Sequence, residues 1–130
     1  DVVIEPMPEN LEIESDPAMT EQALLNILDN AAKYAPPQTP IVISGQTRDK
    51  GFAFTIRDHG KGIPDDKLEA IFDKYSRLKQ KDSQVAGTGL GLSIAKSIIE
   101  AQEGSITVAN HSEGGAVFKI YLPNARIMDK

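Results

Sequence analysis

Three short stretches of the chain carry the groups with which it could do chemistry. Residues 26–34, Asn-Ile-Leu-Asp-Asn-Ala-Ala-Lys-Tyr, offer carboxamides and a cation. Residues 58–63, Asp-His-Gly-Lys-Gly-Ile, place a carboxylate before two glycines, and residues 87–92, Gly-Thr-Gly-Leu-Gly-Leu, are rich in glycine. Together such groups can hold a purine, a divalent metal ion and a polyphosphate. Nucleotide binding is therefore the leading hypothesis.

The first stretch places its polar side chains on one face of a predicted helix. Asn26, Asn30 and either Lys33 or Tyr34 recur at helical spacing, beside the apolar stripe. A carboxamide oxygen is a good ligand for Mg²⁺, which takes few protein ligands, and Lys33 could meet a phosphate as a point charge. An amphipathic helix with a hydrated polar edge explains the same residues, and this stretch alone favours that simpler interpretation.

The second stretch follows a predicted strand. Asp58 could accept a hydrogen bond from the exocyclic amine of adenine, while Gly60 and Gly62 would let the backbone approach the flat ring. Asp, His and Gly are also common turn residues, so an ordinary turn is the alternative. By itself this pattern is not specific.

The third stretch leads directly into a predicted helix. Free backbone N–H groups and the positive end of the helix dipole make such a start an anion site. A polar loop, not a strand, precedes it, and Gly91 is followed by Leu92 and Ser93, so two familiar phosphate-binding patterns do not fit. A glycine-rich hinge before a buried helix explains the motif alone about equally well.

Composition narrows the class of protein. The 130 residues are 40% hydrophobic and 25% charged, which is typical of one globular domain. A net charge of -5 and few aromatic residues argue against nucleic acid as a partner. There are no cysteines for disulfides or thiolate metal sites. No apolar run could cross a bilayer, so we expect this domain not to be inserted in a membrane.

Three helices are expected. Asp16-Pro17 is a strong helix start, and apolar residues recur at helical spacing over residues 19–35. Residues 65–72 predict a short helix. Residues 89–102 predict a second long helix, with Gly104 at the position of a C-terminal cap. His59 and His111 have no partner cluster, and we expect both to be exposed and without a role.

Short extended segments separate these helices. We expect strands at residues 2–4, 11–13, 41–46, 52–56, 105–110 and 117–122, with hairpin turns at residues 49–51 and 113–115. Residues 73–88 are polar and lack periodicity, which predicts a mobile loop. The order of helices and strands predicts an α+β two-layer sandwich, with helices on one face of the sheet.

The three stretches, with Phe-Asp-Lys-Tyr-Ser-Arg at residues 72–77, resemble the catalytic, ATP-binding domain of sensor histidine kinases. They look like its N, G1, F and G2 boxes, and the KdpD type is the most similar. The resemblance covers nearly the whole chain, from Asp16 to Pro123. Four boxes in order are far more specific than any one of them. The domain starts on Asp1, and we expect it to be cut from a longer protein.

The resemblance implies the sandwich shared with gyrase, the Hsp90 chaperone and mismatch-repair ATPases. In that fold, a mixed, mainly antiparallel sheet of about five strands carries three helices on one face. ATP lies between helices and a lid, here residues 73–88. Residues 1–130 would form a single catalytic ATP-binding domain, without the phosphoacceptor and dimerisation domain.

The resemblance also implies roles for individual residues. Asn30 would bind Mg²⁺ with Asn26 beside it, and Asp58 would recognise the adenine amine. Catalytic roles would fall to Asn26, Lys33 and Arg77. The nucleotide would be held by Asn30, Lys33, Tyr34, Asp58, Gly60, Gly62, Ile63, Arg77, Gly87, Thr88, Gly89, Leu90, Gly91 and Leu92. Much of the family has Thr or Ser where this chain has Ala116, which puts one water-mediated adenine contact in doubt.

Three functions are compatible with these residues. The first is a kinase half that binds Mg-ATP and gives its γ-phosphoryl group to a histidine on a separate phosphoacceptor domain, with a response regulator receiver domain downstream. It would be inactive in autophosphorylation without that domain, a monomer in isolation, and cytoplasmic within a membrane-anchored parent. The second is an autonomous ATPase, although Asn26 stands where such relatives carry a Glu to activate water. The third is a nucleotide-sensing module.

Overall fold

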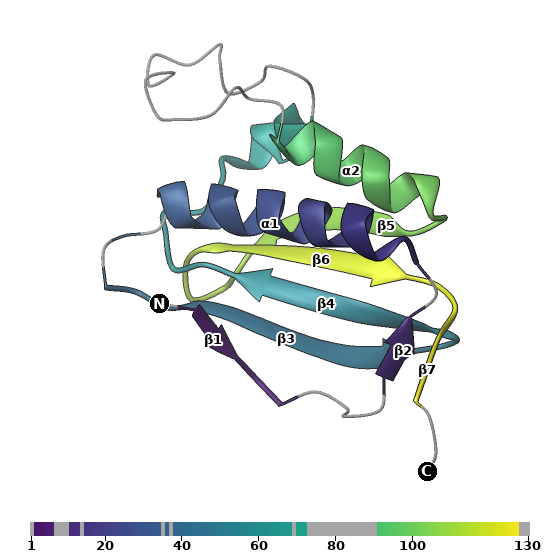
Figure 1. Ribbon diagram of the computed structural model, residues 1–130. Coiled ribbons are helices and arrows are strands. Elements are labelled where there is room, and N and C mark those ends of the chain that lie inside the picture. The colour runs from purple at the N-terminus through teal and green to yellow at the C-terminus, as the bar shows by residue number, and fades with distance from the viewer. Residues whose placement is uncertain are drawn as a thin grey trace.

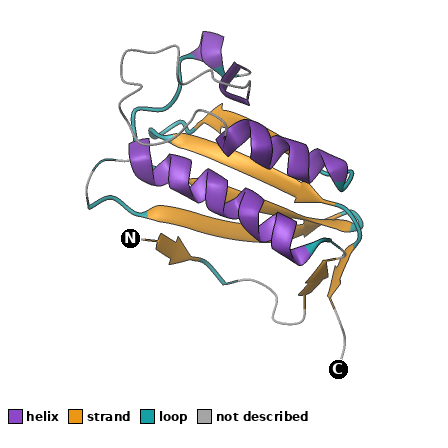
Figure 2. Ribbon diagram, turned by 45° about the horizontal axis from the view of Figure 1, so that its top comes forward, coloured by secondary structure: helices purple, strands orange, loops and turns teal. Residues whose placement is uncertain are grey.

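The computed structural model describes residues 2–6, 11–13, 15–34, 36, 38–68, 70–72 and 91–127. Within these ranges, helices α1 (Pro17–Tyr34) and α2 (Gly91–Ala101) lie side by side on one face of a large sheet (Figures 1 and 2). The expectation of a two-layer α+β sandwich is confirmed. The proposed lid at residues 73–88 lies outside the described residues.

The large sheet has five strands in the order β1-β3-β4-β6-β5. Strand β1 runs parallel to β3, and the other neighbours are antiparallel, which confirms a mixed, mainly antiparallel sheet. The strands are β1 (Val2–Ile4), β3 (Ile41–Arg48), β4 (Gly51–Arg57), β5 (Ser105–Asn110) and β6 (Ala116–Leu122). Both predicted hairpins are present. Strand β2 (Leu11–Ile13) pairs instead with β7 (Ala125–Ile127), a strand that was not predicted.

Capping contacts mark the start of α1 and the end of α2. The Asp16 carboxylate accepts a hydrogen bond of 3.1 Å from the Met19 amide, which confirms it as the cap of α1. At the end of α2, Glu103 rather than Gly104 takes the left-handed backbone conformation, with φ of 64°. The Gly104 amide donates to the Ile99 carbonyl at 3.0 Å, as in a Schellman cap. The predicted cap position was therefore wrong by one residue.

The third predicted helix, at residues 65–72, is absent as an α-helix in the described part of the chain. Two 3₁₀ turns, Asp65–Lys67 and Ala70–Phe72, stand in its place. Eight residues are too few for an α-helix to be stable by itself, so tertiary contacts decide the backbone. Ile71 and Phe72 are both buried in the core, and their packing sets the second turn.

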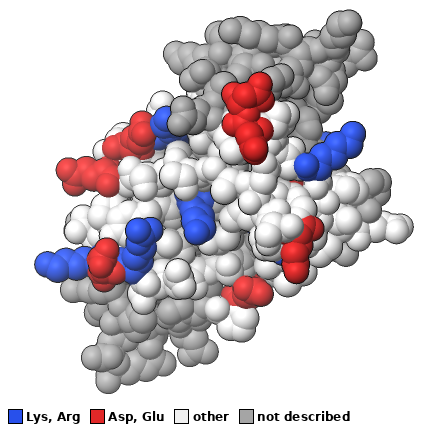
Figure 3. All heavy atoms as spheres, turned by 180° about the vertical axis from the view of Figure 1, so that it is seen from behind, with Lys and Arg blue, Asp and Glu red and all other residues white. Residues whose placement is uncertain are grey.

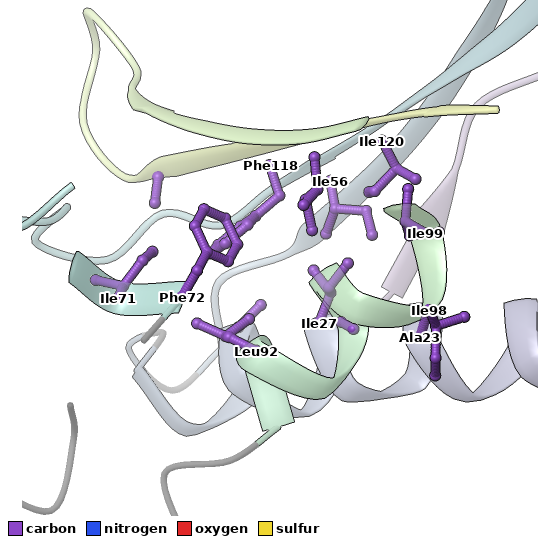
Figure 4. Packing of buried hydrophobic residues seen from close by; sticks show 14 of the residues in the cluster. Ala23, Ile27, Ile56, Ile71, Phe72, Leu92, Ile98, Ile99, Phe118 and Ile120 are labelled. Carbon is purple, nitrogen blue, oxygen red and sulfur yellow. The ribbon is translucent and has the colours of Figure 1, made fainter. Parts of the chain in front are cut away.

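The core lies between the helix layer and the facing side of the sheet. Alternate residues of β6 are buried, as the period of a strand with one covered face requires. Figure 4 shows Ile27 of α1 and Leu92 of α2 close to Phe72 and the strands. The Phe72 and Phe118 rings meet edge to face at 6.2 Å. No helix in the described ranges is long and apolar enough to span a bilayer.

Candidate nucleotide-binding site

Asp58 lies at the end of β4 and is only 6% exposed. Its Oδ1 accepts hydrogen bonds from the amides of Gly60, at 2.9 Å, and Ala116, at 3.1 Å. Its own amide donates to the Ala116 carbonyl at 3.0 Å. Within the described ranges, the other carboxylate oxygen, Oδ2, accepts no hydrogen bond from the protein. Among the described residues, the carboxylate is thus held through Oδ1 alone.

The turn between β5 and β6 packs directly against the backbone of Asp58. Gly115 has φ of 90°, and a Cβ there would collide with the Asp58 carbonyl oxygen and lie 2.8 Å from its carbon. The turn is closed by a 2.8 Å bond from the His111 amide to the Gly115 carbonyl. Sequence reasoning identified this segment only as a hairpin turn. The structure shows that it also positions Asp58.

Ala116 contacts Asp58 through its backbone. Both the Ala116 amide and its carbonyl bond to Asp58. These two bonds do not depend on the side chain, so the absence of Thr or Ser leaves the Asp58 orientation intact. The contact that the resemblance put in doubt is a different one, made by a hydroxyl.

The loop after Asp58 is tied to β5 by Asn110, which sequence reasoning did not single out. Asn110 Oδ1 accepts from the Ile63 amide at 2.8 Å, and its Nδ2 donates to the Ile63 carbonyl at 2.7 Å. Gly62 has φ of 81°, a conformation that other residues rarely adopt. The only sequence signal for this tie is an Asn at the end of a strand, which is common near turns.

The two histidines are not the exposed residues that were expected. Both are partly buried. His59 Nδ1 donates to the Pro40 carbonyl at 2.8 Å, and His111 Nδ1 accepts from the Glu113 amide at 3.0 Å. Each ring thus has a backbone hydrogen-bond partner, and the expectation that both histidines are exposed was wrong.

The polar edge of α1 meets the start of α2. A Cβ at Gly91 would lie 3.9 Å from Asn26 Cβ, so the first and third predicted stretches come together here. Asn26 and Asn30 are half-buried, and Lys33 is exposed. In the described ranges no three His, Cys, Asp or Glu side chains are grouped to hold a metal ion.

The remaining predicted site residues differ in how much of them the structure describes. The Leu92 side chain is 4% exposed and belongs to the core, so only its backbone amide at the start of α2 could meet a phosphate. The Tyr34 backbone ends α1, but its side chain is outside the description. Arg77, Gly87, Thr88, Gly89 and Leu90 all lie outside the described residues.

Acidic and basic side chains are interspersed on the face seen from behind (Figure 3). On that face the described Lys and Arg side chains do not gather into one large patch. The described charges on that face therefore form no positive patch that would attract a polyanion. Among the described residues predicted to serve the phosphates, Asn26 of α1 lies next to Gly91 at the start of α2.

Comparisons with known proteins agree with this geometry. The family model described as histidine kinase-, DNA gyrase B-, and HSP90-like ATPase matches residues 15–126. Sensor protein KdpD of Escherichia coli (strain K12) is 40% identical over 118 residues, which are 90% of this chain and 13% of KdpD. The sensory kinase SasA of Nostoc sp. (strain PCC 7120) is 43% identical over 110 residues, 84% of this chain and 27% of SasA.

Solved structures give the same result. The catalytic domain of histidine kinase ThkA superposes with a TM-score of 0.83 at 30% identity, covering 95% of this chain and 78% of that one. Full-length ShkA in complex with AMPPNP has a TM-score of 0.80 at 26% identity, covering 99% of this chain and 26% of ShkA.

The chain thus matches only a small part of the length of KdpD and SasA, while it matches most of the ThkA catalytic domain. KdpD sensors are among its relatives, as the sequence indicated, although the identity with SasA is as high. The chain belongs to the histidine kinase-, DNA gyrase B-, and HSP90-like ATPase family and is a catalytic domain of the sensor histidine kinase type.

Proposed function

We propose that the chain binds Mg-ATP and donates its γ-phosphoryl group to a histidine on a separate phosphoacceptor domain. The observation that carries the proposal is the Asp58 carboxylate. It is buried, one oxygen is fixed by two backbone amides, and the other accepts no hydrogen bond from the described residues. A carboxylate presented in this way suits the exocyclic amine of adenine. Family membership and the AMPPNP in the ShkA complex support an adenine nucleotide as the ligand.

The α1 edge would serve the phosphates. Asn30 would provide a carboxamide oxygen for Mg²⁺, with Asn26 beside it, and Lys33 would approach the phosphates as a cation. Bound Mg²⁺ would neutralise the negative charge that develops during phosphoryl transfer. Arg77 and the backbone amides of residues 87–92 would add positive charge and hydrogen bonds on the other side. Tyr34 would line the sugar side, and Gly60, Gly62 and Ile63 would face the ring.

An autonomous ATPase is the second candidate, because the family includes gyrase and HSP90-like members. Hydrolysis requires a group that takes a proton from the attacking water. The α1 residue one turn before Asn30 is Asn26, and a carboxamide cannot take a proton at neutral pH. Transfer to a positioned histidine does not need that base on this chain. The kinase function therefore fits the residues better, and a sensing module without transfer ranks third.

The proposed setting follows from this reaction. Residues 1–130 would act as one catalytic unit within a longer kinase. The phosphoacceptor domain of the same parent protein would be its first partner, and a response regulator receiver domain would take the phosphoryl group next. We propose a cytoplasmic location, because ATP is available there, and a monomeric state for the isolated domain.

Labelled ATP distinguishes the three functions. The chain is mixed with the phosphoacceptor domain of its parent protein, Mg²⁺ and ATP carrying a γ-³²P label. Acid-labile, base-stable label on the phosphoacceptor domain supports the kinase function. Release of free phosphate without labelled protein would support the ATPase, and binding with neither product would support a sensing module. A phosphoacceptor domain with its histidine replaced by Ala controls for label at other residues.

A further inference from the structure

Asn110 joins two segments that lie far apart in the sequence. It is the last residue of β5, and it bonds to the loop that follows β4. Its carboxamide pairs with both backbone groups of Ile63, as a neighbouring strand would in a ladder. Its Nδ2 also lies 3.3 Å from Asp65 Oδ1. One side chain thus fixes the loop's path into the next turn.

The loop is held at two points. At its start, the Gly60 amide donates to Asp58 Oδ1, and at its end Ile63 is held by Asn110. Between them Gly62 has a positive φ, and a Cβ there would lie only 2.6 Å from Asn110 Oδ1. The close approach of Asn110 and the shape of the loop at Gly62 therefore depend on each other.

Asn110 is placed to act on this loop more than on the core. The side chain is exposed, and each of the three hydrogen bonds that it makes to described residues crosses to the loop or its first turn. Buried apolar packing holds β5 and β6 without it, through residues such as Ile106 and Phe118. Loss of such a contact should loosen one loop and leave global stability largely unchanged.

We propose that Asn110 is a positioning residue for nucleotide binding. It holds Gly62 and Ile63 in the conformation that packs against the adenine ring, so the base side of the site is formed before ATP arrives. This inference rests on the proposed function. Without Asn110 only a fraction of molecules would have the loop in place, and the apparent affinity would fall by that fraction.

The test uses the 130-residue chain labelled with ¹⁵N and titrated with Mg-ATP and Mg-ADP by NMR. For Asn110→Ala we expect an affinity about tenfold lower, the factor that corresponds to about 1.4 kcal/mol. The factor should be equal for ATP and ADP, because the lost contact serves the base. Exchange protection of the Ile63 amide should disappear, while that of the Ala116 amide should remain. Ser112→Ala, in the adjacent exposed turn, is the matched control and should stay within twofold of the wild type.

Asn110→Asp separates hydrogen bonding from side-chain shape. Asp keeps the size and one acceptor, but its second oxygen would face the Ile63 carbonyl and the Asp65 carboxylate. We expect it to weaken ATP binding at least as much as Ala does. Affinity equal to the wild type would show that shape alone matters and would contradict the inference. Should Asn110→Ala unfold, Asn110→Asp takes its place in the comparison.

The two levels of the proposal fail in different ways. Suppose that the wild type binds ATP, that Asp58→Ala abolishes this binding, and that Asn110→Ala binds ATP as well as Ser112→Ala does. Then Asn110 has no positioning role, and the proposed function stands. If the wild type shows no saturable binding of Mg-ATP, the proposed function is wrong and this inference falls with it.

Discussion

Replacing Asp58 by Asn changes the chemistry of the site while keeping the size of the side chain. In the wild type, Oδ1 accepts from the Gly60 and Ala116 amides. An Asn at position 58 must keep its oxygen there, because its NH₂ group cannot accept from those donors. The NH₂ group would then stand where Oδ2 stands now. It would face the adenine amine, so two donors would meet.

The size of the effect follows from the bond that is lost. A hydrogen bond to a charged group contributes about 1.5–3 kcal/mol net, and each 1.4 kcal/mol is about tenfold in affinity. We therefore expect Asp58→Asn to weaken ATP binding by about 10- to 150-fold. The fold should survive, because both backbone amides keep an oxygen acceptor. These bonds lose their charge assistance, and we expect unfolding to become easier by about 1–2 kcal/mol.

Calorimetry with two nucleotides tests the geometry as well as the affinity. Inosine triphosphate carries a carbonyl oxygen in place of the adenine amine, and that oxygen can accept from the Asn NH₂ group. The preference for ATP over inosine triphosphate should therefore shrink or reverse in Asp58→Asn. Asp66→Asn, at an exposed acid in the following turn, is the control and should change neither affinity. An equal loss for both nucleotides, or none for ATP, would show that Asp58 does not recognise the amine.

Two further variants test the metal side of the site and the core. Asn30→Ala should reduce the gain in ATP affinity that Mg²⁺ provides, with little change in affinity when EDTA is present; titrations with and without Mg²⁺ would show this. An undiminished Mg²⁺ effect would remove Asn30 as a metal ligand. Phe72→Ala should lower the free energy of unfolding in urea by about 3–5 kcal/mol, because a buried ring packed against Phe118 is lost. A change below 1 kcal/mol would mean that the ring is not part of the core.

The elements that sequence predicted well are those set by local chemistry. The cap at Asp16 fixed the start of α1, and apolar spacing gave both long helices to within a few residues. The two hairpins followed from turn residues between alternating segments. Asp58 was identified as a site residue because a carboxylate after a strand and before glycines is a recognisable local pattern. The burial of Asp58 and its hydrogen bonds from backbone amides could not be predicted from the sequence and are seen only in the structure.

The elements that sequence missed depend on distant partners. Strand β7 has three residues, and its partner β2 lies near the other end of the chain. Asn110 and Ile63 are 47 residues apart, and their bonds require the register between β5 and β6 as well as the path of the loop. Residues 65–72 have a helical pattern, yet the burial of Phe72 prevails over it. Such outcomes are tertiary, and local propensity is too weak to decide them.

The position of Ala116 shows how this fold can orient a carboxylate without a side-chain hydroxyl. Adjacent antiparallel strands exchange backbone bonds, and the pair between β4 and β6 continues one step beyond the strand into Asp58. The Ala116 amide, which would otherwise extend the ladder, donates to the Asp58 carboxylate instead. The absence of a side chain at Gly115 leaves room for the Asp58 carbonyl. Orientation of Asp58 is therefore a property of strand register. It follows that a substitution at residue 116 can change contacts to water or ligand, whereas a change that shifts the β5–β6 turn would move the carboxylate itself.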